Sequence, residues 1–197
     1  AELARSLPGL STGLHLVLSG REAPAASPRH KIPDLVDGSG RFPASPAWAG
    51  ISDALFWLRR RGQIEREIRA QIERHLETGL PIDHVDGHHH LHMHPLVFDV
   101  LLACMEEYGI RWVRLVDEDP VARSGATGRV STALVLRLLP RIEASCVELY
   151  AHPDRGSDQG RREEEALCAP SVREAIEAAG FRLVNTRFLG AAAAAAA

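Results

Sequence analysis

The sequence predicts an α/β fold, and within that class a (β/α) barrel, from three observations. Short apolar stretches typical of strands alternate along the chain with longer stretches of helical periodicity. The strand-like stretches are too apolar to face water, which favours a parallel sheet covered by helices. The candidate catalytic and metal-binding residues follow the carboxyl ends of predicted strands. A (β/α) barrel carries its active site on the face where those strand ends lie. The alternative is an open doubly wound sheet, but no Gly-x-Gly-x-x-Gly or Walker-type loop is present, so nucleotide binding is not favoured.

In the first half of the chain, an apolar run bounded by Ser, Thr and Gly predicts a strand at 13–18. Residues 21–50 are rich in Pro, Ala, Ser and Gly and predict a long loop, for instance a wall of a substrate groove. A helix is expected over 63–78, closed by Gly79. Its apolar stripe is Ile64, Ile68, Ile72 and Leu76.

A strand at 83–86 leads into a histidine-rich segment, and a helix apolar nearly all round follows over 96–108, stopped by Gly109. The pattern then predicts a strand at 111–116 and a helix at 131–139. Another strand is expected at 146–151. A capping box from Ser171 to Glu174 predicts the start of a helix that ends at Gly180, and 181–185 the last strand.

Length and composition predict one domain over residues 1–190. A net charge of −3 gives no basic surface for nucleic acid, and no segment is apolar for long enough to span a bilayer. Without a signal peptide or a disulfide pattern, the chain is expected in the cytoplasm. The three separated cysteines are expected to be reduced core residues: Cys104, Cys146 and Cys168.

The two ends of the chain differ from the rest of the sequence. The first residues resemble the tail of a helix, so a segment upstream of Ala1 is expected. Residues 191–197 are seven alanines, which we expect to be unassigned positions without functional weight.

Six of the ten histidines lie between positions 84 and 94, directly after a predicted strand. Neutral imidazole is the commonest protein ligand for metals, and a strand end can direct several side chains at one point. A solvated loop or a tag is the alternative, but the segment is internal and interrupted by Leu91 and Met93. The segment therefore predicts a metal site, and its alternating directions predict that only one or two of the six histidines take part.

Two other strands offer imidazole, His15 within 13–18 and His152 after 146–151. If the strands are parallel neighbours, these groups converge with the histidine-rich segment at one edge. Each has a plainer interpretation, because His15 could be a hydrogen-bonded core histidine and His152 could begin a turn. Asp86 could be a ligand, a base or the partner that fixes an imidazole tautomer.

Several segments in this order resemble the YdjC-like family, which includes chitooligosaccharide deacetylase and hopanoid-biosynthesis-associated deacetylase-like proteins. The resemblance covers nearly all of residues 1–190. The segments are Gly13-Leu14-His15-Leu16, Ile32-Pro33-Asp34-Leu35-Val36-Asp37, Gly40-Arg41-Phe42, the block from His84 to Met93, Val113-Arg114, Ala151-His152-Pro153 and Gly180-Phe181-Arg182-Leu183.

The resemblance implies a distorted (β/α) barrel of the polysaccharide-deacetylase type and a divalent metal held by one aspartate and two histidines. By position, the histidine ligands are His15 and His88. His152 matches the histidine that protonates the leaving amine, and Arg114 orients a carboxylate. Family members open with a strand ending in Ala-Asp-Asp-Phe-Gly, which supplies the metal aspartate and the catalytic base. That motif does not occur here, so both are expected upstream of Ala1.

These observations predict a metal-dependent hydrolase that removes the N-acetyl group from an amino sugar, on its own or in an oligosaccharide. His90 and His92, like Asp86, are expected to touch substrate or support the ligands. The family is usually assigned Mg²⁺, whereas two imidazoles and a carboxylate also suit Zn²⁺. The alternatives are glycosidic hydrolysis, which needs two carboxylates, and a non-catalytic metal-binding or scaffold protein of a sugar or hopanoid lipid pathway. A homodimer is also compatible with the sequence.

Overall fold

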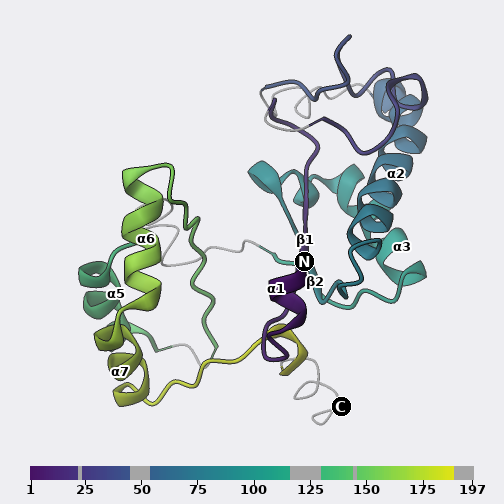
Figure 1. Cartoon of the computed structure of the whole chain (residues 1–197). Helices are drawn as coiled ribbons and strands as arrows, with labels where there is room; N and C mark the ends of the chain where they lie inside the picture. The colour runs from purple at the N-terminus through teal and green to yellow at the C-terminus, as the bar shows by residue number, and fades with distance from the viewer. Residues whose placement is uncertain (22–23, 45–53, 116–129, 144–145, 189–197) are drawn as a thin grey trace. The chain divides into compact units, whose positions relative to one another are not determined.

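The computed structural model describes residues 1–21, 24–44, 54–115, 130–143 and 146–188, and for 54–58 it describes the backbone alone. The chain divides into two compact units (Figure 1). The first is Ala1–Leu115 with Val184–Ala197, and the second is Val116–Leu183. The architecture is of the α/β type, with many helices and a small parallel sheet. That residues 1–190 fold as one domain stays a prediction.

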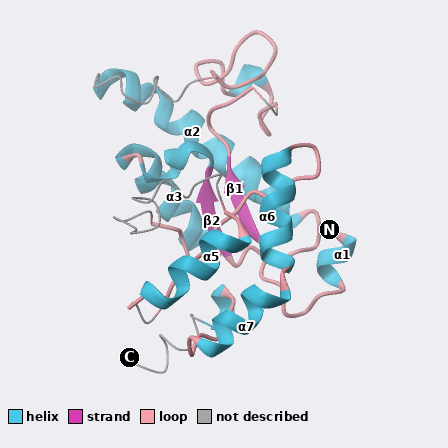
Figure 2. Ribbon diagram, turned by 90° about the vertical axis from the view of Figure 1, so that its left-hand side faces the viewer, coloured by secondary structure: helices cyan, strands magenta, loops and turns pink. Residues whose placement is uncertain are grey.

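Two strands form the centre of the first unit, β1 (Gly13–Leu16) and β2 (His84–Gly87). They run parallel and lie side by side (Figure 2), with His15 in register with Asp86. Along β1, Leu14 and Leu16 are buried while His15 between them is exposed. Side chains alternate between the faces of a strand, so burying the leucines presents the histidine to solvent.

The strand expected at 111–116 is much shorter within its described part. Val113 forms a single parallel bridge with Val85 of β2. The amide of Val85 donates to the carbonyl of Trp112 at 2.8 Å, and the amide of Arg114 donates to the carbonyl of Val85 at 2.9 Å. These two bonds fix the backbone of Arg114 beside β2.

Helices and 3₁₀ turns complete this unit, and α2 and α3 lie side by side (Figure 1). They are α1 (Glu2–Arg5), η1 (Arg29–Lys31), α2 (Ala54–Leu76), η3 (His88–Met93) and α3 (Pro95–Glu107). The helix expected from residue 63 begins nine residues earlier, because nothing in 54–62 breaks it and Gly62 is tolerated inside a helix. As predicted, Gly79 and Gly109 follow the two long helices in left-handed conformation, with φ of 74° and 69°.

The core of the first unit joins the strand pair to both helices. Three members of the predicted stripe, Ile64, Ile68 and Ile72, are at most 1% exposed, but Leu76 at the helix end is 42% exposed. The prediction that α3 is buried nearly all round is wrong, because Leu102 on its outer face is 43% exposed. The buried face of α3 consists of Val97, Val100, Leu101, Cys104 and Met105.

The described part of the loop predicted at 21–50 is folded onto α2. Ile32 and Phe42 are at most 1% exposed in the same core. The fully buried carboxylate of Glu67 accepts the amides of Ala26 and Ser27, each at 2.8 Å. A carboxylate that accepts two backbone amides satisfies donors that a loop would otherwise bury unpaired. The proposed role as a wall of a substrate groove stays a prediction.

The second unit contains α5 (Thr132–Leu138), η4 (Leu139–Arg141), α6 (Asp158–Cys168) and α7 (Pro170–Ala178). Its small core is Val130, Val135, Ala166 and Val172. The helix predicted at 131–139 is confirmed as α5, and the Ser131 hydroxyl accepts the amide of Leu134 at its start.

Two predicted strands of this region, 146–151 and 181–185, do not form ladders in the structure. Their apolar side chains lie exposed instead, with Leu149 39% and Leu183 65% exposed. An apolar run becomes a strand only where a neighbouring strand accepts its backbone hydrogen bonds, and the described residues place none beside these runs.

The capping box predicted at Ser171 is also wrong. Helix α7 (Pro170–Ala178) has its N-cap two residues earlier, at Ala169, with Pro170 in its first turn. Proline is favoured there because its fixed φ suits the first turn and its missing N–H has no partner to lose.

Of the cysteines predicted in the core, only Cys104 is buried, while Cys146 and Cys168 are exposed. Among the described residues, no helix is both long and apolar enough to cross a membrane.

Candidate functional site

The strand register brings a histidine and a carboxylate together. His15 Nδ1 lies 2.8 Å from Asp86 Oδ1 across the β1–β2 pair. The imidazole is 52% exposed and the carboxylate 16% exposed. A carboxylate can only accept this hydrogen bond, so the His15 proton sits on Nδ1 and the lone pair of the neutral ring is on Nε2. This is the tautomer that a metal ligand needs.

Arg114 holds the other side of the same carboxylate through an ion pair between its guanidinium and Asp86 Oδ2. Burial raises the pKa of Asp86, but the hydrogen bond from His15 and the charge of Arg114 together bring that pKa below its usual value. Asp86 is therefore an anion at neutral pH. It links a strand-end imidazole to an arginine fixed by the Val85 bridge.

His88 is the first residue beyond β2, and its ring faces that of His15. The ring centroids are 5.8 Å apart with an interplanar angle of 77°. Two imidazoles at this separation fit two positions of a divalent-metal site. Among the described residues, no group of three or more His, Cys, Asp or Glu is arranged to hold an ion. The roles of His15 and His88 as ligands stay predictions.

The turn after His88 has an unusual backbone. His89 and His90 have φ of 52° and 55°, the only non-glycine residues in the described part of the chain with positive φ. Ser19, fully buried, forms a 2.9 Å hydrogen bond between its hydroxyl and His89 Nδ1. Left-handed conformation costs a β-substituted residue about 1–3 kcal/mol, and strain of this kind gathers at functional sites. The two left-handed residues lie in the turn that follows the end of β2 at Gly87.

His92 points inward from the same turn and is fully buried. Its Nε2 donates to the carbonyl oxygen of Arg114 at 2.7 Å, while its buried Nδ1 has no hydrogen-bond partner among the described residues. Burial lowers the pKa of His92, so the ring is neutral at physiological pH. His92 thus holds the backbone of Arg114 through this hydrogen bond. Its expected role, to touch substrate or to support the ligands, stays a prediction.

His90 lies on the exposed side of the turn, with its ring centroid 6.2 Å from that of His92. Burial and the nearby charge of Arg114 lower the pKa of His90. This ring is neutral near physiological pH and can accept a hydrogen bond. Its contact with substrate stays a prediction.

Gly87 makes the inward placement of His92 possible. A Cβ at this position would lie 2.6 Å from His92 Nδ1 and 2.9 Å from His92 Cβ. We expect Gly87→Ala to lower the free energy of unfolding by about 1–3 kcal/mol, because the buried ring must move. Urea unfolding measures this loss, and Gly38→Ala, whose Cβ would meet nothing within 4 Å, is the matched control. Equal stabilities of the two variants would contradict the packing argument.

His152 belongs to the second unit, where its side chain is exposed. Its backbone amide donates to Glu163 Oε2 at 2.5 Å, and its ring lies edge-on to Tyr150 with centroids 6.0 Å apart. Convergence of His152 with His15 and His88 stays a prediction.

Sequence reasoning missed Ser19 and Glu163. Ser19 follows the apolar run 13–18, and a single hydroxyl there does not indicate a functional residue. Glu163 lies in a charged stretch, which is typical of a solvent-exposed helix face. Only folding reveals that each is fully buried against a backbone or side chain of the histidine motifs.

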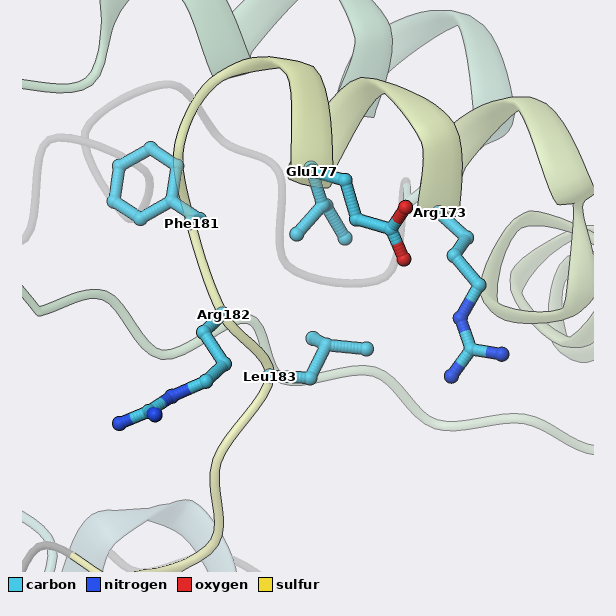
Figure 3. A pocket seen from close by; sticks show the side chains of 6 residues that line it. Arg173, Glu177, Phe181, Arg182 and Leu183 are labelled. Atoms are coloured by element: carbon cyan, nitrogen blue, oxygen red, sulfur yellow. The ribbon is translucent and has the colours of Figure 1, made fainter.

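A pocket of about 230 Å³ lies on the second unit, between α7 and the segment that follows it (Figure 3). None of the predicted site residues lines it. The lining residues are Arg173, Ile176, Glu177, Phe181, Arg182 and Leu183.

A family model described as YdjC-like protein matches residues 1–178. The chain belongs to the YdjC-like family. The match includes all the histidines of the site, and the family resemblance predicted from the motifs is confirmed.

Curated relatives of this YdjC-like chain carry deacetylase names. A carbohydrate deacetylase of Geobacillus stearothermophilus is 41% identical over 108 residues, which cover 55% of this chain and 39% of the relative. A chitooligosaccharide deacetylase of Serratia marcescens is 29% identical over 219 residues, covering 93% of this chain and 79% of the relative. The first of these matches thus spans about two fifths of the relative's length.

A solved structure from Enterococcus faecalis V583, of a protein named as a candidate for cellobiose-phosphate cleavage, is similar to this YdjC-like chain. Its TM-score is 0.72 at 25% sequence identity, and the match covers 95% of this chain and 81% of that one. The fold is therefore shared over nearly the whole chain.

Proposed function

We propose that this YdjC-like chain belongs to a metal-dependent hydrolase that removes the N-acetyl group from an amino sugar, in a chito-oligosaccharide or a related glycan or glycolipid. The observation that carries the proposal is the joined set of His15, Asp86, Arg114 and His88 at the end of a parallel strand pair. The deacetylase names of the relatives support the choice of reaction.

In this proposal His15 and His88 would hold a divalent ion. Such an ion, when bound, lowers the pKa of water and polarises a carbonyl. Asp86 keeps the His15 proton on Nδ1 and so presents Nε2 to the ion. Arg114 keeps Asp86 ionised, because its charge disfavours protonation of that carboxylate.

The reaction adds water across the amide bond. A water oxygen bonds to the acetyl carbon while the water gives a proton to a base, which the family resemblance implies is an aspartate. The bond from that carbon to the sugar nitrogen breaks, and the nitrogen must gain a proton to leave as an amine. We assign that proton to the imidazole of His152, acting as general acid. The products are acetate and the free amino sugar.

The proposal extends to two finer points. The fold is proposed to be a distorted (β/α) barrel, because the ligand-bearing residues lie at the ends of parallel strands. The ion is proposed to be Mg²⁺ from the family resemblance, with Zn²⁺ as the alternative that two imidazoles favour.

The test is acetate release by the natural gene product that contains these residues. We expect the protein, loaded with Mg²⁺ or Zn²⁺, to release acetate from N-acetylglucosamine oligomers and to lose this activity on chelation. Mass spectrometry of the sugar product separates the alternatives, because deacetylation preserves chain length while glycosidic hydrolysis shortens it. Metal-loaded protein that binds the ion yet releases no acetate from any N-acetylated amino sugar would favour the non-catalytic metal-binding or scaffold role.

A further inference from the structure

We propose that Glu163 and Gly160, both on α6, are positioning residues that fix the loop carrying His152 for its role as proton donor. This inference rests on the proposed function of His152. It adds to the site two residues whose side chains would never touch the substrate.

The first observation is the buried carboxylate of Glu163. The residue is fully buried, and its Oε2 accepts the backbone N–H of His152 at 2.5 Å. Its second oxygen, Oε1, has no hydrogen-bond partner within the described residues. A buried carboxylate with one amide partner is costly, and apolar side chains usually fill such places at less cost. The fold keeps the acceptor where it meets His152.

The second observation is the close packing of Gly160, in α6, against Asp154 of the loop that carries His152. A Cβ on Gly160 would lie 2.4 Å from the carbonyl oxygen of Asp154 and 2.5 Å from its amide nitrogen. Gly160 lies in the first turn of α6, where its own amide donates to the Ser157 hydroxyl at 3.0 Å. The absence of a side chain therefore lets the loop lie directly on the start of the helix.

Together the two contacts hold the loop at two points, His152 and Asp154. Pro153 between them has a fixed φ, so little backbone freedom remains. Asp154 Oδ1 accepts the amide of Gly156 at 2.9 Å and closes the turn that follows. The pKa of Asp154 lies below its usual value because of this bond, so the carboxylate acceptor is ionised at neutral pH.

The buried carboxylate of Glu163 positions the exposed side chain of His152 through the backbone of that residue. The imidazole of His152 is exposed and flanked by the ring of Tyr150, while its backbone is tied to the interior of the second unit. A general acid works only when its proton lies within hydrogen-bond reach of the leaving atom, and small displacements lower the rate steeply. The hydrogen bond to Glu163 fixes the backbone of His152, and with it the position from which the exposed imidazole extends.

The experiment compares Glu163→Leu with Glu163→Gln in the natural, metal-loaded protein. Gln keeps an oxygen acceptor for the His152 amide, whereas Leu removes it. We expect Glu163→Leu to lower kcat about 10- to 100-fold with KM within about twofold. Glu163→Gln should keep kcat within about threefold of wild type, since it restores the acceptor. Exposed Glu165 on the same helix gives the matched controls Glu165→Leu and Glu165→Gln, which should leave kcat unchanged.

Hydrogen exchange at the His152 amide gives a readout that does not depend on activity. Exchange should accelerate at least tenfold in Glu163→Leu and stay close to wild type in Glu163→Gln. If wild type shows no deacetylation, the proposed function fails, and amide exchange alone decides whether Glu163 holds His152. Unchanged exchange in Glu163→Leu, or equal loss of kcat in Leu and Gln variants, would overturn the inference.

Gly160→Ala supplies an independent variant if Glu163→Leu does not fold. Its methyl group must displace Asp154, so kcat should fall without loss of bound metal. A folded Gly160→Ala protein with wild-type kcat would overturn the role of Gly160. Its fall in kcat together with shifted amide signals at residues 152–156 would support it.

Discussion

Replacing His88 with alanine is expected to remove metal binding and to lower kcat/KM by about a thousandfold or more. A bound divalent ion contributes several kcal/mol to the stability of a hydrolytic transition state, and each 1.4 kcal/mol is about tenfold in rate. The ring of His88 lies 5.8 Å from that of His15, so removing it leaves one imidazole where the proposed site needs two. Elemental analysis after dialysis and acetate release measure the two losses.

His94→Ala is the matched control for this change. His94 belongs to the same histidine-rich segment but occupies the N-cap position of α3, after the turn has ended. Its replacement should lower stability modestly and leave metal content near one ion per chain. Equal loss of metal in both variants would contradict the assignment of His88 and point to a general collapse of the segment.

His152→Ala is expected to lower kcat by about a hundred- to ten-thousandfold while the metal content stays unchanged. An acid that protonates the departing nitrogen acts in the transition state and does not hold the ion. The loss is incomplete because polarisation of the carbonyl would continue without the acid. Metal analysis and acetate release on the same preparation measure both quantities.

The pH dependence of kcat gives a second criterion for His152. The limb that falls at high pH in the wild type reports the acid that must be protonated, and it should disappear in His152→Ala. If the variant loses the ion, His152 is a ligand instead. If kcat and its pH profile are both unchanged, His152 has no part in proton transfer.

Local sequence was sufficient for the elements that depend on nearby residues. The two strands, the long helices and their glycine ends follow from apolar periodicity and from the backbone freedom of Gly79 and Gly109. The family and the histidine motifs were also readable, because their spacing is a property of the chain itself. Predictions failed where an element needed a distant partner, as in the runs 146–151 and 181–185 that form no ladder in the structure.

Within the site, the sequence determined which donors and acceptors are available, and the tertiary structure decided which of them lie together. No local pattern shows that Asp86 meets His15, but the β1–β2 register places their side chains 2.8 Å apart although the residues are 71 positions apart in the sequence. His92 looked like its neighbours in the sequence, yet the left-handed turn at His89 directs it into the interior. The physical reason is that residue type fixes the available donors and acceptors, while their partners are fixed by long-range packing that no local pattern contains.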